Sequence, residues 1–227
     1  MRVSVIIPVF NERGSLPLVV ADIPRERVSE ILVVDNGSTD GTALVARDLP
    51  VRLVREERRG YGSACLAGVA ALEASPPDVV VFLDGDYSDH PEELPRLLEA
   101  IERGADLVIG SRTVGEREPG ALLPQARFGN LLACFLIRLL YNHRYTDLGP
   151  FRAIRWGAYR RLDMRDPDFG WTCEMQVKAV REGLRIAEVP VSYRRRVGVS
   201  KITGTVSGTL RAGWKIFGTI LRYALNP

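Results

Sequence analysis

Two aspartates directly follow one of the most apolar runs of the sequence. The stretch VVVFLDGDYSDHPEEL, residues 79–94, passes from Val, Phe and Leu residues straight to Asp84 and Asp86. In an extended chain, side chains at i and i+2 point to the same side, so these two carboxylates can share one target. Carboxylates held this close repel each other unless a cation lies between them, and oxygen ligands suit Mg²⁺ or Mn²⁺. The sequence therefore predicts a divalent metal site at this aspartate pair.

The strands that would position the pair recur along the first half of the chain. Apolar runs occur at 3–10, 31–35, 51–54, 79–84 and 107–109, with helix-like segments near 15–22, 41–48, 62–74 and 91–103. This alternation is typical of βαβ units, so we predict an α/β fold with a mostly parallel sheet flanked by helices. Ligands of such sheets bind beyond the carboxyl ends of the strands. The polar residues that follow these strands, and that we expect to converge on one crevice, are Asn11, Glu12, Asp35, Asn36, Ser38, Asp84, Asp86, Ser111 and Arg112.

The second half of the chain has a different pattern. Residues 120–142 form an apolar helical segment with few polar interruptions, and residues 205–225 predict a final amphipathic helix. Its apolar stripe contains Val206, Leu210, Trp214, Phe217, Leu221 and Leu225, beside the cations Arg211, Lys215 and Arg222. Such a helix packs either on the domain's own core, the more common case, or in a membrane interface. Both alternatives stay open, including a peripheral membrane contact through 205–225.

Composition and charge restrict the class of protein. The chain has 227 residues, of which 46% are hydrophobic and 26% charged, which is typical of one large soluble domain. Three cysteines without metal-ligand spacing, and the lack of an apolar run of about 20 residues, favour a reduced cytoplasmic location without a membrane span. Seven cations and no acidic residue follow Glu188. This basic segment favours phosphates or anionic lipids as partners, whereas no aromatic platform or recognition helix supports nucleic-acid binding.

Several motifs resemble those of the family 2 glycosyltransferases, which have the Rossmann-like GT-A fold. PVFNE at 8–12, VVDNGSTDGT at 33–42 and DGD at 84–86 occur in this order, each at a predicted strand end. The later stretches GSR, TDLGPFRAIR, GWTCEMQ, EVPVSYRRR and GVSKITGT resemble the branch of dolichyl-phosphate mannosyl- and glucosyltransferases and their polyprenyl-phosphate relatives. The resemblance covers essentially the whole chain.

The resemblance implies a GT-A catalytic domain at 1–204, followed by the C-terminal amphipathic helix at 205–227. Within the domain, it implies a nucleotide-sugar-binding half at 1–112 and an acceptor-binding half at 113–204.

The first strand ends are expected to bind the donor. The nucleotide-sugar-binding residues that the resemblance implies are Pro8, Phe10, Asn11, Glu12, Asp35, Ser38, Asp40, Asp84, Gly85, Arg196 and Lys201. A carboxylate such as Asp35 can accept an N–H group of uracil or guanine. Arg196 and Lys201 belong to an R-x-G-x-S-K loop, which in relatives closes over the donor diphosphate. Ser88 stands where polyprenyl-phosphate relatives often have a glutamine, so Ser88, or Asp89 in its place, is expected to join the metal ligands.

The resemblance also implies residues for the acceptor and for catalysis. The acceptor-binding set is Arg112, Arg127, Asp147, Arg152 and Trp171, and the catalytic set is Asp86, Arg112 and Glu174. Glu174 stands where many inverting members keep a general base for an acceptor hydroxyl. A lipid phosphate is already ionised near pH 7 and needs no base, so arginines would position it instead.

These features predict an inverting glycosyltransferase that moves a hexose from a UDP- or GDP-sugar to a polyprenyl or dolichyl phosphate, with Mg²⁺ or Mn²⁺ as cofactor. The alternative is a family 2 enzyme that glycosylates a hydroxyl of a glycolipid or small molecule, with Glu174 as base. A non-catalytic nucleotide-sugar-binding protein is disfavoured by the aspartate pair and by Lys201. The expected location is cytoplasmic, either free or peripheral at the cytoplasmic face of the membrane. The sequence leaves the sugar, the nucleotide base and the oligomeric state open.

Overall fold

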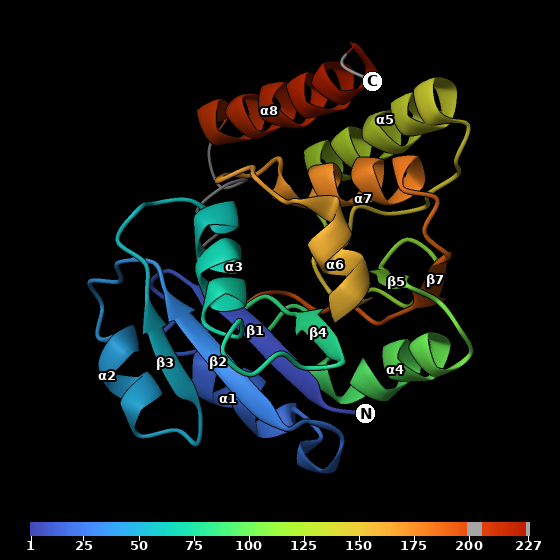
Figure 1. The fold of residues 1–227 in the computed structure, drawn as a ribbon. Helices are drawn as coiled ribbons and strands as arrows, with labels where there is room; N and C mark the ends of the chain where they lie inside the picture. The colour runs from blue at the N-terminus through green and yellow to red at the C-terminus, as the bar shows by residue number, and fades with distance from the viewer. Residues whose placement is uncertain (199–205, 226–227) are drawn as a thin grey trace.

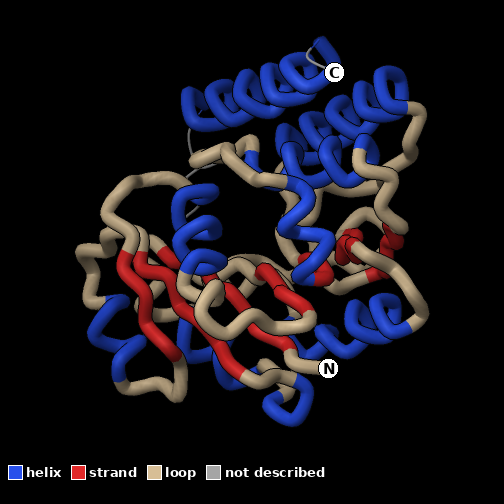
Figure 2. The backbone as a smooth tube through the Cα atoms, in the orientation of Figure 1, coloured by secondary structure: helices blue, strands red, loops and turns tan. Residues whose placement is uncertain are grey.

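A seven-stranded sheet forms the centre of the computed structural model, which describes residues 1–198 and 206–225 (Figures 1 and 2). The strand order is β3-β2-β1-β4-β6-β5-β7. The strands are β1 (Val3–Val9), β2 (Glu30–Asp35), β3 (Arg52–Arg55), β4 (Val79–Phe82), β5 (Leu107–Ser111), β6 (Arg152–Arg155) and β7 (Ile186–Pro190). All neighbours pair in parallel except β6, which is antiparallel to both β4 and β5. The predicted α/β fold with a mostly parallel sheet is therefore confirmed.

Helices cover both faces of this sheet (Figure 1). One face carries α1 (Leu16–Asp22), α2 (Thr42–Arg47) and α4 (Leu94–Glu102), and the other carries α3 (Tyr61–Ala70), α5 (Pro124–Tyr141), α6 (Trp156–Leu162) and α7 (Trp171–Arg181). Short 3-10 helices span Arg25–Arg27 (η1) and Pro91–Glu93 (η2). Because successive strand side chains point to opposite faces, β1 sends Val5 and Ile7 into one core and Ile6 into the other. Burial on both faces explains why the central strands are continuous apolar runs.

The C-terminal helix α8 (Val206–Leu225) packs along α5 and α7 (Figure 1). Ile220 is fully buried there, and the Tyr141 hydroxyl donates to its carbonyl over 2.6 Å. The predicted apolar stripe does not coincide with the buried face, because Trp214 is 79% and Leu221 48% exposed. The side chains of Val206, Leu210 and Leu225 lie outside the described part of the helix. Within residues 1–198 and 206–225, no helix has the length and apolar character needed to cross a bilayer.

The sheet register brings three loops to one edge. Val9 at the end of β1 pairs with Asp35 at the end of β2, while Ile6 in the middle of β1 pairs with Phe82 at the end of β4. Because these strands are parallel, the loops that follow β1, β2 and β4 all leave the sheet at its carboxyl edge. The segments with the predicted donor-binding residues therefore meet there.

Candidate active site

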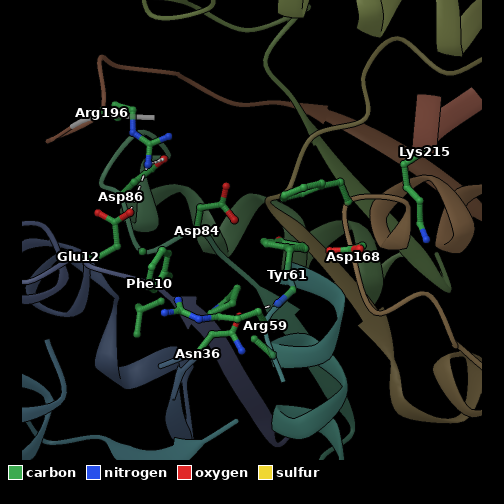
Figure 3. Close-up of a pocket in the computed structure, with 16 residues that line it drawn as sticks. Phe10, Glu12, Asn36, Arg59, Tyr61, Asp84, Asp86, Asp168, Arg196 and Lys215 are labelled. Atoms are coloured by element: carbon green, nitrogen blue, oxygen red, sulfur yellow. Dashed lines mark hydrogen bonds and ion pairs between the residues drawn. The ribbon is translucent and has the colours of Figure 1, made fainter. Parts of the chain in front are cut away.

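A cavity of about 400 Å³ opens at this edge of the sheet (Figure 3). The first part of its lining comes from β1 and from the loops that follow β1, β2 and β4. The rest comes from the start of α3, the loop before α7, the segment after β7, and α8. The residues with the clearest chemistry are Phe10, Glu12, Asn36, Arg59, Tyr61, Asp84, Asp86, Asp168, Arg196 and Lys215. Of the predicted donor-binding residues, the cavity brings together Pro8, Phe10, Glu12, Asp84, Gly85 and Arg196.

The aspartate pair carries an incomplete set of partners. Asp86 Oδ1 accepts hydrogen bonds from the Ser88 amide, over 2.9 Å, and from the Ser88 hydroxyl. Its Oδ2 lies 3.1 Å from Arg196 Nη2, which also donates to Glu12 over 3.2 Å. Asp84 Oδ1 is enclosed and has no hydrogen-bond partner among the described residues. Burial, and then the charge of Asp86, raises the pKa of Asp84 to about 7.

The donor set fits a hard divalent cation that is shared with a substrate. Carboxylate oxygens are suitable ligands for Mg²⁺ and Mn²⁺. In the part of the chain that the structure describes, no group of three or more Asp, Glu, His or Cys side chains could hold a metal alone. A cation at Asp84 and Asp86 would therefore need additional oxygens from water or from a phosphate. Ser88 orients Asp86. Asp89 is fully buried and neither of its carboxylate oxygens has a partner among the described residues; burial and then the charge of Asp84 raise its pKa well above normal.

One end of the cavity presents an aromatic ring and an arginine. The Arg59 guanidinium lies 3.8 Å from the centroid of the Phe10 ring. Asn36 fixes the loop that carries Arg59, because its amide group donates to the carbonyls of Glu56 and Arg58 and accepts from the Gly60 amide, with distances of 2.8 to 3.0 Å. Asn36 was expected at this edge of the sheet because it follows a predicted strand, whereas Arg59 was not predicted, although it lies just before a predicted helix.

Four further predicted residues organise the loops beneath the cavity. Asp35 is buried, and its Oδ1 accepts from the Ser38 amide while its Oδ2 has no partner among the described residues. Asn11 adopts a φ of 56°, donates its amide to the Ser38 hydroxyl and accepts from the Thr39 amide. Asp40 accepts from the Thr42 amide over 2.9 Å. These bonds join the loops after β1 and β2, and the four side chains lie outside the described cavity lining.

Glu174 lies away from the cavity lining, in the first turn of α7. It is fully buried and accepts hydrogen bonds from the amides of Arg165 and Asp166 and from the Tyr223 hydroxyl of α8. Lys178 Nζ lies 2.8 Å from the same carboxylate. The structure thus uses Glu174 to join the loop before α7 to the C-terminal helix.

Arg152 and Trp171 are enclosed in the core, which differs from the expected contact with an acceptor. Arg152 donates to the carbonyls of Gly149 and Thr172, and its side chain has no exposed surface. Trp171 packs edge-on against Phe82 of β4, with ring centroids 4.6 Å apart. Both side chains therefore hold together elements around the cavity: Arg152 joins β6 to α7, and Trp171 packs against β4 and α3.

Arg112 and Asp147 form a buried ion pair at the end of β5. Arg112 Nε and Nη2 each lie 2.8 Å from one oxygen of Asp147, so the contact is bidentate. The guanidinium also lies 5.1 Å from the Tyr193 ring centroid. The predicted donor-loop residue Lys201 falls outside the described residues.

A second cleft, of about 590 Å³, runs beside α5. Its lining includes four arginines, namely Arg117, Arg127, Arg138 and Arg144, so it contains the predicted acceptor residue Arg127. The same helix exposes Phe128, Leu131, Phe135 and Leu139, each at least 56% accessible to solvent. A spacing of three and four residues places these side chains on one face of the helix. The cleft is therefore both basic and bordered by exposed apolar side chains.

Comparisons with known proteins agree with this geometry. The family model of Glycosyl transferase family 2 matches residues 4–163. An undecaprenyl-phosphate mannosyltransferase of Micrococcus luteus is 38% identical, over 92% of this chain and 90% of that protein. A polyprenol monophosphomannose synthase of Mycolicibacterium smegmatis is 35% identical, over 90% and 82% of the two chains. The crystal structure of glucosyl-3-phosphoglycerate synthase from Mycobacterium tuberculosis, in complex with Mn²⁺, UDP and glucosyl-3-phosphoglycerate, has a TM-score of 0.78 and covers 100% of this chain and 81% of that one. Its sequence identity is 23%, so this likeness shows the fold alone.

Proposed function

Because the chain belongs to glycosyl transferase family 2 and has the GT-A fold, we propose that this glycosyltransferase moves a hexose from a UDP- or GDP-sugar to a polyprenyl phosphate, with inversion at the anomeric carbon. The names of the two mannosyl-transferring relatives support the lipid phosphate and favour mannose as the hexose. The observation that carries the proposal is the enclosed oxygen of Asp84, beside Asp86 at the end of β4, which has no hydrogen-bond partner in residues 1–198 and 206–225.

The donor binds in the cavity at the carboxyl edge of the sheet. Asp84 and Asp86 hold Mg²⁺ or Mn²⁺, which when bound neutralises charge on the leaving nucleoside diphosphate. The ion pairs of Arg196 with Asp86 and Glu12 support its assignment to the diphosphate, and Lys201 is assigned the same role. The end of the cavity that carries Phe10 contacts the nucleoside. Asp35, which lies outside the cavity lining and whose Oδ2 has no partner among the described residues, is assigned to an N–H group of the base.

The acceptor binds in the basic cleft beside α5. Arg127 and Arg138 hold the dianionic phosphate, because guanidinium groups make strong charge-assisted hydrogen bonds to phosphate oxygens. Phe128, Leu131 and Phe135 lie along the polyprenyl chain. The exposed stripe of α5, together with Trp214 of α8, provides apolar area for a peripheral contact with the membrane that holds this lipid. We assign the enzyme to the cytoplasmic face, where nucleotide sugars are expected.

The chemical step needs no general base. An oxygen of the acceptor phosphate forms a bond to the anomeric carbon of the hexose, while the bond from that carbon to the β-phosphate oxygen breaks. The nucleoside diphosphate leaves with the electron pair, and no proton has to be removed because a phosphate monoester is mostly dianionic near pH 7. Transfer to a hydroxyl would need a base, and Glu174 is buried with its oxygens bonded to Arg165, Asp166, Tyr223 and Lys178. This observation favours the phosphate acceptor.

A nucleotide-release assay tests the proposal. Purified protein with Mn²⁺ is given GDP-mannose, UDP-glucose or UDP-N-acetylglucosamine, each with and without undecaprenyl phosphate. We expect release from one donor only, dependent on the lipid phosphate and lost in Asp86→Asn. The exposed Asp48→Asn serves as the matched control and retains activity. Donor binding without lipid-dependent release would contradict the acceptor, and failure to bind any of the donors would contradict the donor assignment.

A further inference from the structure

One wall of the donor cavity has polar groups that the proposed function does not use. In the view of Figure 3, Glu12, Asp86 and Arg196 lie on one side of Asp84, and Tyr61 and Asp168 lie on the other. The first side serves the metal and the diphosphate in the proposed function. Tyr61 and Asp168 therefore need a different explanation.

The Tyr61 hydroxyl is enclosed and has no hydrogen-bond partner within the described chain. An enclosed hydroxyl without a partner is unfavourable, because it has lost its bonds to water. Tyr61 and Asp84 line the same cavity (Figure 3), and a phenol carries its proton at neutral pH. The ring is held edge-on against Trp171, with centroids 6.0 Å apart. Tyr61 is thus a fixed hydrogen-bond donor at the cavity wall, beside the metal-binding carboxylate.

Asp168 is held against the same wall by contacts of its loop. The carbonyl of Pro167 accepts from the Ser63 amide over 2.8 Å, which attaches the loop to the first turn of α3. This approach requires glycine at two positions: a Cβ on Gly60 would lie 2.1 Å from the Pro167 oxygen, and a Cβ on Gly62 would lie 2.0 Å from the Asp166 oxygen. Asp168 lines the cavity. Within residues 1–198 and 206–225, its carboxylate forms no hydrogen bond and no ion pair. It is therefore a fixed acceptor facing the same space.

We propose that Tyr61 and Asp168 bind hydroxyl groups of the donor hexose and thereby determine which hexose the enzyme accepts. The inference rests on the donor half of the proposed function. A sugar hydroxyl both donates and accepts, and this wall offers one donor, the phenol, and one acceptor, the carboxylate. A site built to hydrogen-bond a substrate hydroxyl strongly rejects an analogue that places no hydroxyl there, because its enclosed polar groups are then left unpaired. A hexose epimer that points a hydroxyl away from this wall would be rejected for that reason.

Binding measurements without an acceptor test the inference. The dissociation constants of the nucleotide sugar and of the free nucleoside diphosphate are measured with Mn²⁺ on the wild type, Tyr61→Phe and Asp168→Asn. We expect each variant to weaken nucleotide-sugar binding by about tenfold or more, and to leave nucleoside-diphosphate binding within about twofold. The preference between GDP-mannose and GDP-glucose, which differ at one hydroxyl, should shrink in parallel.

Two matched controls separate sugar contact from a general effect on the fold. Tyr159 is another enclosed phenol without a partner among the described residues, and it lies outside the cavity lining. Asp163 is an exposed carboxylate at the start of the loop that carries Asp168. Tyr159→Phe and Asp163→Asn should bind both ligands like the wild type. Thermal unfolding of all four variants verifies that they fold.

Several results would overturn the inference. Wild-type binding of both ligands by Tyr61→Phe and Asp168→Asn would do so, as would equal weakening of both ligands, which indicates a distorted cavity. A third such result is a wild-type protein that binds the nucleotide sugar no more tightly than the free nucleoside diphosphate, because the sugar would then add no binding energy. None of these measurements involves the lipid. A protein that fails to transfer to undecaprenyl phosphate, yet loses sugar affinity in these two variants, would therefore contradict the proposed acceptor and support the inference.

Discussion

The donor cavity and the cleft beside α5 are built in different ways. The cavity collects side chains from the ends of three strands and from several loops and helices, and it includes Asp84, whose enclosed oxygen has no partner among the described residues. The cleft takes most of its residues from α5 and from the segments next to it, and its apolar side chains are exposed. A site assembled from many elements is fixed by the fold, whereas a site on one helix face varies with single surface substitutions. We therefore expect the donor side to be chemically rigid and the acceptor side to be adjustable.

The largest effect is expected from removing one carboxylate of the aspartate pair. Asp84→Asn should lower transfer by about 10²–10³-fold, because the metal and the developing charge on the diphosphate lose a fixed ligand. The variant should bind the lipid acceptor normally. Steady-state nucleotide release and lipid binding measure the two quantities. A matching loss of acceptor affinity would show that the two regions are not independent.

Substitution of Glu174 distinguishes a structural role from a catalytic one. Glu174→Gln removes a buried charge that Lys178, Tyr223 and two backbone amides contact, so the free energy of unfolding should fall by about 2–3 kcal/mol. Below its unfolding transition, the folded variant should keep transfer activity within about tenfold of the wild type. Denaturant titration measures the change in stability, and initial rates measure the change in activity. The control is Glu182→Gln, at an exposed residue at the C-terminal end of α7, the helix that carries Glu174. Unchanged stability with a loss of kcat of about 10²-fold or more would identify a base instead.

The acceptor cleft is tested by removing two of its arginines. Arg127→Ala combined with Arg138→Ala should lower kcat/KM for undecaprenyl phosphate by about ten- to a hundredfold, because two charge-assisted contacts to the phosphate are lost. The dissociation constant of the donor should stay the same. Arg47→Ala, an exposed arginine at the end of α2, is the control. A weaker donor affinity in the double variant would place these arginines at the donor instead.

The smallest effect concerns the pH dependence of metal binding on the donor side. A cation must displace the proton of Asp84, whose pKa is about 7 in the metal-free fold, so affinity for Mn²⁺ should rise as the pH rises toward 7 and level off above it. Below pH 7 the change is at most about tenfold per pH unit. Calorimetric titration between pH 5.5 and 8.5 measures the profile. A flat profile would mean that Asp84 is already ionised without the metal.

The same proton affects stability in the opposite direction. Asp84 is protonated in the metal-free fold up to about pH 7, whereas an unfolded aspartate loses its proton near a pKa of about 3.9. The folded state therefore gains stability from this proton at low pH and loses it as the pH rises through about 7. Asp84→Asn should lack this component of the pH profile of unfolding.

The fold and much of the donor site could be predicted because their signals are local. A buried strand is an apolar run, and a polar residue just after it lies at the carboxyl edge of the sheet; this is how Asp84, Asp86 and Glu12 were predicted. The strand β6 gave no such signal, because its four residues RAIR contain two arginines. It is recognisable only after Arg152 is seen to bond buried carbonyls.

The remaining site residues depend on contacts between distant segments. Tyr61 and Asp168 are more than a hundred residues apart, and they meet because two glycines admit a loop to the first turn of α3. Conversely, a buried arginine or tryptophan looks the same in a sequence as one that binds a ligand. Arg152 and Trp171 were placed with the acceptor for this reason, although packing encloses both.

The position of α8 makes this helix important for the site, although it lies outside the family motifs. Every motif that identifies the family lies before residue 206, yet Lys215 lines the donor cavity and Tyr223 bonds to Glu174. A nonsense codon just before this helix would leave those motifs intact. Its product would lack part of the cavity wall, leave Glu174 with one donor fewer, and uncover the faces of α5 and α7 on which Ile220 is buried. Annotating such a truncated reading frame from its motifs alone would therefore mistake a damaged enzyme for an intact one.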